Sequence, residues 1–243
     1  MRPHKFTVQL SLVLFVLVFC LDASAQQRRP PSGGRLAVVV DERLAALRST
    51  PRLTGSLVRR LSRGRLVAIR SAKMGPDGVT FLFVNVTTRT RGWIQRESVV
   101  SASNRGDDQR LFQLINDSHG FDRIVRCRIF LDHFPRSPLR PAVLLLIGDT
   151  AEQLSTDLSK SISRKLTAPL YAPEKTYYLN HPSLDRYSRQ NIHFLFNPTT
   201  HRLHYDGQAW RVLLHLHPKS PEAAEAKERL AELNLNSEET KPD

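Results

Sequence analysis

Short apolar runs separated by turn residues occupy the chain from residue 35 to residue 100. The runs are rich in β-branched and aromatic residues, and the longest, 79–86, reads VTFLFVNV. Turns are indicated between them, most clearly at 75–78 (GPDG), because proline presets φ and glycine accepts a positive φ. The apolar runs are 36–40, 44–47, 53–61, 66–69, 79–86, 93–94 and 99–100, and they predict five or six short strands. Strands this short and this closely spaced predict a small all-β barrel.

Beyond residue 106 the apolar positions recur with the spacing of helices. Helices are predicted from Asp107 or Asp108 to Gly120, over 121–134, over 139–165 and over 208–216. Pro135 ends the second of these, because proline cannot donate a backbone hydrogen bond, and Ser137-Pro138 is a typical helix start. The chain is therefore expected to be α+β, with a β part followed by a helical part.

A helix, a proline break and a second helix occur twice in the C-terminal half. Residues 130–138 (FLDHFPRSP) align with residues 213–221 (LLHLHPKSP), 83 positions further along the chain. Helical hairpins of this kind stack by their apolar faces and form concave binding surfaces. The helical-hairpin domain is predicted over 109–235, with a polar tail at 236–243.

A β-hairpin is predicted between the two helical units. Residues 192–196 (IHFLF) and 201–205 (HRLHY) alternate around the turn 197–200 (NPTT). The expected pairs are Phe196 with His201, Phe194 with Leu203 and His193 with His204. Two adjacent imidazoles can begin a zinc site, but the spacing supplies no third ligand, so no metal is expected.

The N-terminus has the three parts of a secretory signal peptide. Arg2 and Lys5 precede an apolar run over 10–21, and Ala23-Ser24-Ala25 provides small residues for cleavage after Ala25. An uncleaved anchor and a lipid anchor at Cys20 are the alternatives. The mature chain would begin with a flexible lead-in over 26–34, and the protein is expected to be periplasmic or extracellular.

Positive charge is concentrated in the N-terminal half. Residues 26–104 contain 15 Lys and Arg against 4 Asp and Glu, whereas residues 105–243 contain 19 against 18. This asymmetry favours two parts, joined by a linker over 101–108 (SASNRGDD). Five arginines form the candidate polyanion surface: Arg52, Arg59, Arg60, Arg63 and Arg65. A well-solvated face is the alternative interpretation, peripheral contact with a membrane surface stays open, and nucleic acid is not the expected partner.

The β part resembles a known family. Residues 46–51 (ALRSTP), Gly64 with the following LVAI, and Gly92-Trp93-Ile94 together resemble the bacterial SH3-like (SH3b) domain over 35–100. The resemblance implies a barrel that binds peptides or peptidoglycan without catalysis. The candidate ligand-binding residues are Arg48, Phe83 and Trp93. Packing of Trp93 in the barrel core is the competing interpretation.

The helical breaks resemble those of tetratricopeptide-like repeat proteins of the bacterial envelope, which implies a protein partner. The sequence carries no G-x-S-x-G, H-E-x-x-H, P-loop or G-x-G-x-x-G motif. Cys127 lies between two arginines that would favour a thiolate, but its apolar helical pattern indicates a small buried residue. No catalytic residue and no cofactor are therefore expected. The predicted function is an exported binding or scaffold protein, with a basic polyanion binder and an unrecognised cell-wall hydrolase as alternatives.

Overall fold

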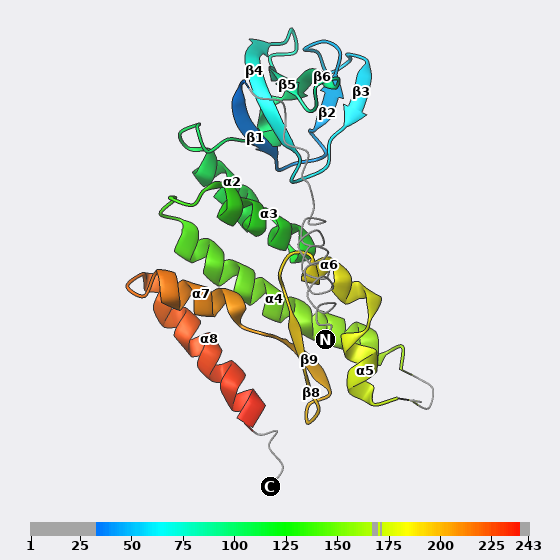
Figure 1. Ribbon diagram of the computed structural model, residues 1–243, viewed down its shortest axis with the longest axis vertical. Helices are drawn as coiled ribbons and strands as arrows, with labels where there is room; N and C mark the ends of the chain where they lie inside the picture. Colours follow the sequence, from blue (N-terminus) through cyan, green and yellow to red (C-terminus); the bar gives the residue numbers. More distant parts are fainter. Residues whose placement is uncertain (1–32, 167–169, 171, 239–243) are drawn as a thin grey trace, which may run out of the picture.

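The computed structural model describes residues 33–166, 170 and 172–238. An antiparallel sheet forms one end of an elongated molecule, and helices with a small β-hairpin form the rest (Figure 1). The α+β class is thus confirmed. The predicted signal peptide, Cys20, the cleavage site at Ala25 and most of the lead-in lie outside the described residues.

Seven strands build the larger sheet, close to the positions that the apolar runs predict. They are β1 (Arg35–Val39), β2 (Ala46–Arg48), β3 (Leu57–Arg60), β4 (Leu66–Met74), β5 (Thr80–Asn85), β6 (Arg91–Gln95) and β7 (Val99–Val100). The strand expected over 53–61 is shorter because Gly55 belongs to a turn, where its N–H donates to the Arg52 carbonyl at 3.1 Å. β4 is longer than expected because its second half pairs with β5 as far as Met74 and Thr80.

The strands follow the order β3-β2-β6-β5-β4-β1-β7, and each paired neighbour is antiparallel. The edge strands β3 and β7 do not pair with each other, so the described strands do not close into a barrel. Bulges beside Arg48 and Arg70 bend the sheet, as an extra residue in one strand does. Its inner face carries a compact apolar core that includes Leu47, Leu82 and Ile94.

The helical part contains α2 (Asp107–Asn116), α3 (Gly120–His133), α4 (Arg140–Ser163), α5 (Glu174–Leu179), α6 (Asp185–Ser188), α7 (Gln208–Leu216) and α8 (Pro221–Glu238). Two short 3-10 helices are also present, η1 (Arg96–Ser98) and η2 (Pro182–Leu184). The bounds of α7 agree with the prediction, whereas Gly120 begins α3 instead of ending α2. The short helices α5 and α6 were not predicted, because segments of this length hold too few turns to show a period.

Both predicted proline breaks adopt the same backbone conformation. Phe134, after α3, has φ −120° and ψ 61°, and His217, after α7, has φ −135° and ψ 51°. Each donates its N–H to the carbonyl four residues earlier, at 2.9 and 2.8 Å respectively. The helical pairs α3/α4 and α7/α8 are therefore built alike, and α4 lies between α3 and α7 (Figure 1).

The small hairpin forms from β8 (Phe194–Asn197) and β9 (Arg202–Tyr205), but the predicted pairing was wrong by two positions. Phe194 pairs with Tyr205 and Phe196 with Leu203, because the loop spans 198–201. The Asn197 side chain causes the shift by accepting hydrogen bonds from the Thr199 and Thr200 amides at 2.9 and 3.2 Å. A register shift of two residues leaves every side chain on the same face of the hairpin, so the predicted apolar face remains.

Strand β1 belongs to two cores at once. Ala37 and Val39 point into the core of the sheet, and Val38 and Val40 belong to the core of the helical part. The predicted linker over 101–108 is anchored at both ends, because the buried Asp107 carboxylate accepts a hydrogen bond from the Ser101 amide at 2.8 Å. The sheet and the helices consequently pack as one body.

Candidate functional site

One row of side chains crosses four strands on the face of the sheet opposite its core. Arg48 of β2 pairs with Trp93 of β6, and Trp93 pairs with Phe83 of β5. Directly paired residues point to the same face of a sheet. The structure therefore brings together the three residues that the sequence suggested as a ligand site. Leu57 of β3 pairs with Arg48 and completes the row, which we call the sheet row.

The aromatic members of the sheet row form a partly open surface. The Phe83 and Trp93 rings lie 5.2 Å apart at 59°, and both side chains are half-buried. Trp93 stands between Gly92 and Ile94, which face the inside of the sheet, so it lies outside the sheet core. Leu57 is 52% exposed at the edge of the sheet. An aromatic pair flanked by an exposed leucine is suited to contact with an apolar ligand group.

Arg48 supplies the cation of the sheet row and also organises the neighbouring loop. Its Nη1 donates to the Gly55 carbonyl at 2.7 Å, which holds the β2–β3 loop against the strand. Its Nε is buried and has no partner among the described residues. The guanidinium is thus fixed in place beside Trp93, with a charge that no carboxylate of the described residues neutralises through an ion pair.

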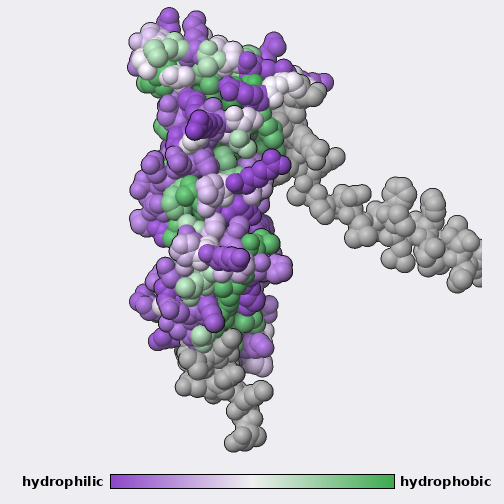
Figure 2. All heavy atoms as spheres, turned by 90° about the vertical axis from the view of Figure 1, so that its left-hand side faces the viewer, coloured by the Kyte–Doolittle hydropathy of each residue, from purple (hydrophilic) through white to green (hydrophobic). Residues whose placement is uncertain are grey.

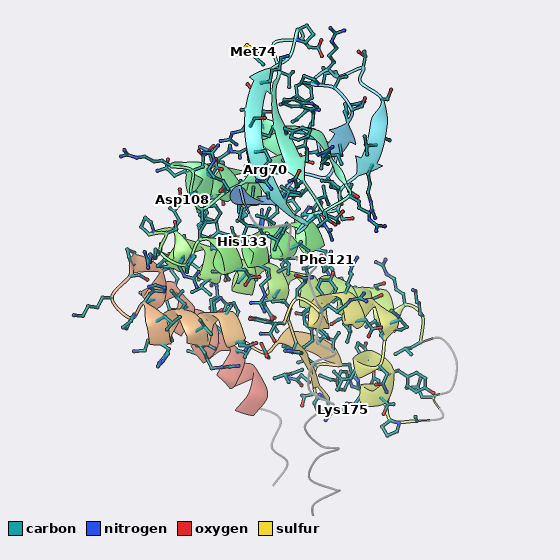
Figure 3. The ribbon with its side chains drawn as sticks, turned by 45° about the horizontal axis from the view of Figure 1, so that its top comes forward. Arg70, Met74, Asp108, Phe121, His133 and Lys175 are labelled. Carbon is teal, nitrogen blue, oxygen red and sulfur yellow. The ribbon has the colours of Figure 1, made fainter. Side chains whose placement is uncertain are left out.

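Two loops border the sheet row at the tip of the molecule. The Leu53 amide donates to the Asp77 carboxylate at 2.8 Å, which joins the β2–β3 loop to the β4–β5 turn. Leu53 and Met74 are 41% and 68% exposed there. Figure 3 shows Met74 at the end of β4 that points away from the helices, whereas Arg70 lies nearer to them. In Figure 2, hydrophobic residues appear in separate groups among hydrophilic ones, including at this end.

Sequence reasoning missed the contribution of Leu57. Simple alternation from Arg59 would assign Leu57 to the same face as Arg59. A bulge at Val58 of β3 breaks this alternation, because Leu47 pairs with Arg59 while the next residue, Arg48, pairs with Leu57. A bulge leaves no clear sequence signal in a strand of four residues. The sequence alone therefore does not identify Leu57 as a member of the sheet row.

The five arginines of the predicted polyanion surface do not form one surface. Arg52, Arg59 and Arg60 are exposed. Arg63 is only 11% exposed and pairs with Asp122 of α3 at 2.8 Å, and its hydrogen bond holds the pKa of that carboxyl below the ordinary value. Arg65 is half-buried and donates to the Val86 carbonyl at 3.3 Å. Arg63 and Arg65 therefore have partners within the fold, and Arg52, Arg59 and Arg60 are the exposed members of the predicted polyanion surface.

The remaining candidates for chemistry are separated from one another. Cys127 is buried in α3, and burial raises the pKa of its thiol to about 12, so it is a packed residue rather than a thiolate. His204 pairs with Leu195 across the hairpin and contacts the Glu152 carboxylate at 3.1 Å, so the predicted His193–His204 pair does not form. Within the described residues no three His, Cys, Asp or Glu side chains gather as metal ligands.

No family model, curated protein or solved structure matches this chain. Across the described residues, no helix combines the length and the apolar character that crossing a membrane requires.

Proposed function

We propose that the protein is an exported, non-enzymatic binding or scaffold protein of the bacterial cell envelope. Its sheet would dock to a peptide or to peptidoglycan through the sheet row, and its helical part would hold a protein partner. The observation that carries the proposal is the row itself, in which Arg48, Trp93 and Phe83 stand side by side outside the sheet core. Burying such aromatic groups against a ligand dominates the energetics of many interfaces.

The sheet row fits a ligand that combines apolar and anionic groups. Leu57 and the Phe83–Trp93 pair offer apolar contact, while Arg48 provides fork-shaped hydrogen-bond donors that match a carboxylate. Peptide stems of a cell wall and acidic peptides both carry this combination. The open, bulged sheet would on this view be a variant of the SH3-like domain, and the two helical pairs would be tetratricopeptide-like hairpins.

Co-sedimentation of the purified chain with peptidoglycan sacculi at about 0.1 M and 1 M salt tests the proposal. Binding through the sheet row should persist at high salt, since apolar contact is not screened. Trp93→Ala should weaken it about tenfold or more, as expected for loss of a central aromatic contact worth about 2 kcal/mol. Leu195→Ala removes an exposed leucine of β8 and should leave binding unchanged. Circular dichroism confirms that both variants fold.

The outcome also separates the alternatives. Unchanged binding by a folded Trp93→Ala variant would contradict the sheet row as the site. Loss of binding at high salt would favour the polyanion binder. The exposed Arg59 and Arg60 on the edge strand β3 are the observation that supports this alternative. Release of soluble fragments would favour a hydrolase, but its nucleophile would not be Cys127, whose thiol is buried.

A further inference from the structure

A cavity of about 190 Å³ lies in the helical part, and it shares no residue with the sheet row. Its walls come from α3, α4, the segment after α6, β9 and α7. Figure 1 shows α3 on one side of α4 and α7 on the other. A single water molecule needs only about 10–15 Å³ of such space. The cavity therefore has room for a small organic molecule.

Four lining residues are apolar and buried, namely Leu144, Ile147, Ile192 and Ala209, and we call them the floor of the cavity. Leu144 and Ile147 of α4 are 4% and 2% exposed, and Ile192 and Ala209 are 2% and 9% exposed. Leu144 and Ile147 are three residues apart and therefore lie on one face of the helix. An aliphatic or aromatic group placed here would leave water and contact side chains that are already ordered.

Two arginines also line the cavity. Arg128 of α3 and Arg140 of α4 form no ion pair with a carboxylate of the described residues. One Nη of Arg140 donates to the Leu131 carbonyl at 2.7 Å, which fixes the position of its guanidinium. The only acidic residue in the lining is Asp132, so the wall carries a net charge of one positive unit.

A buried phenol provides a third donor. Tyr205 is 1% exposed, and its Oη accepts a hydrogen bond from the Ala209 amide at 2.7 Å, which leaves the hydroxyl hydrogen to donate. Burial raises the pKa of Tyr205, so the phenol keeps its proton. At the rim, Asn191 takes a left-handed backbone (φ 57°), and its Nδ2 donates to the Gln208 Oε1 at 3.1 Å. Such local strain is often found at functional sites.

We propose that this cavity binds a small organic monocarboxylate. Its head group would accept hydrogen bonds from Arg128, Arg140 and Tyr205, and its apolar body would lie against the floor formed by Leu144 and Ile147. One net positive charge matches a single carboxylate, and Asp132 disfavours a doubly charged anion. This inference does not depend on the function proposed for the sheet row.

Titration of the full-length chain with hexanoate, followed by NMR of the backbone amides, tests the site. Saturable shifts are expected at Asn191 and Gln208, with tighter binding of hexanoate than of acetate, hexan-1-ol or inorganic phosphate. Arg128→Gln should weaken hexanoate binding about tenfold, because a charge-assisted hydrogen bond is replaced by a neutral one. Arg202→Gln removes an exposed arginine of β9 outside the cavity and is the matched control.

Three results would overturn the proposal. These are the absence of saturable shifts at the rim, equal affinity of Arg128→Gln and the parent chain, and inorganic phosphate binding as tightly as hexanoate. Trp93→Ala should bind hexanoate with the parent affinity, since the cavity and the sheet row are built from different residues. Failure of the sheet row in the sacculus experiment would therefore leave this test intact.

Discussion

Arg59 and Arg63 belong to one basic stretch of the sequence and have opposite roles in the fold. Arg59 is exposed on β3, whereas the Arg63 side chain is only 11% exposed and pairs with Asp122, which lies 59 positions away in the chain. Amino-acid composition does not distinguish the two side chains, because it does not show that a carboxylate far away in the sequence lies next to Arg63 in the fold. Arg63 and Arg65, both assigned to the polyanion surface from the sequence, therefore have partners within the fold, and Arg48 has a structural role in addition to the predicted one.

At the residue scale, Gly148 allows α4 and α7 to approach each other. A Cβ at this position would lie 2.3 Å from the Trp210 Nε1, and the indole is fully buried. Gly148→Ala should therefore lower the free energy of unfolding by about 1–2 kcal/mol, because the overlap outweighs the better helix propensity of alanine. Urea unfolding measures the change. Ser161→Ala on an exposed turn of α4 should have almost no effect, and an equal stability of both variants would argue against close packing at Gly148.

At the scale of elements, the sequence predicts those features that depend on neighbours in the chain. The strands and the two proline breaks follow from runs of β-branched residues, turn residues and helical spacing, all within a few positions. The hairpin register depended on the side chain of one residue, Asn197, and the bulge at Val58 depended on how β3 pairs with β2. The three predicted members of the sheet row came from the family resemblance, but their alignment in one row needed the pairing of strands distant in sequence.

Substitution of Asn197 tests what stabilises the loop of the β8–β9 hairpin. Asn197→Ala removes the acceptor for the Thr199 and Thr200 amides, which should destabilise the hairpin by about 1 kcal/mol. Both amides should then exchange with deuterium several-fold faster. Asn197→Asp keeps the acceptor oxygen, so both amides should stay largely protected from exchange. Thr199→Ala leaves the Asn197 side chain and both backbone amides in place, so it should exchange like the parent chain. Unchanged exchange in Asn197→Ala would show that the loop holds its shape without this side chain.

At the scale of the whole molecule, the sheet and the helices share one junction. Arg126 is buried there, and its Nε and one Nη donate to the Val40 carbonyl at 3.3 Å and the Ser118 hydroxyl at 2.7 Å. Arg96 and Arg110 both pair with the buried Asp107. A junction with this many polar groups loses hydrogen bonds if the two parts separate, since each buried group would then lack its partner. The sheet row and the cavity of the helical part are therefore held in a fixed relation on one body.

The pH dependence of stability tests this junction through Asp122. The pKa of Asp122 lies below its ordinary value of 3.8, chiefly because Arg63 donates a hydrogen bond to it. The unfolded chain therefore binds a proton at higher pH than the folded one. The stabilisation is fully present above about pH 5 and is lost as the pH falls through the lower pKa of the folded state. Asp122→Asn should thus reduce stability at pH 7 by about 0.5 kcal/mol, a small value because the carboxylate is 58% exposed and screened by solvent.

The same variant should lose less stability than the parent between pH 5 and pH 3, because its side chain no longer titrates. Urea unfolding at a series of pH values measures both effects. Asp157→Asn on the exposed side of α4 is the matched control and should retain the acid dependence of the parent. An Asp122→Asn variant with the parent's acid dependence would mean that the Arg63–Asp122 pair does not couple the sheet to α3 in solution. The fixed relation of the sheet and the helices would then rest on the apolar contacts of Val38 and Val40 and on the hydrogen bonds of Arg126.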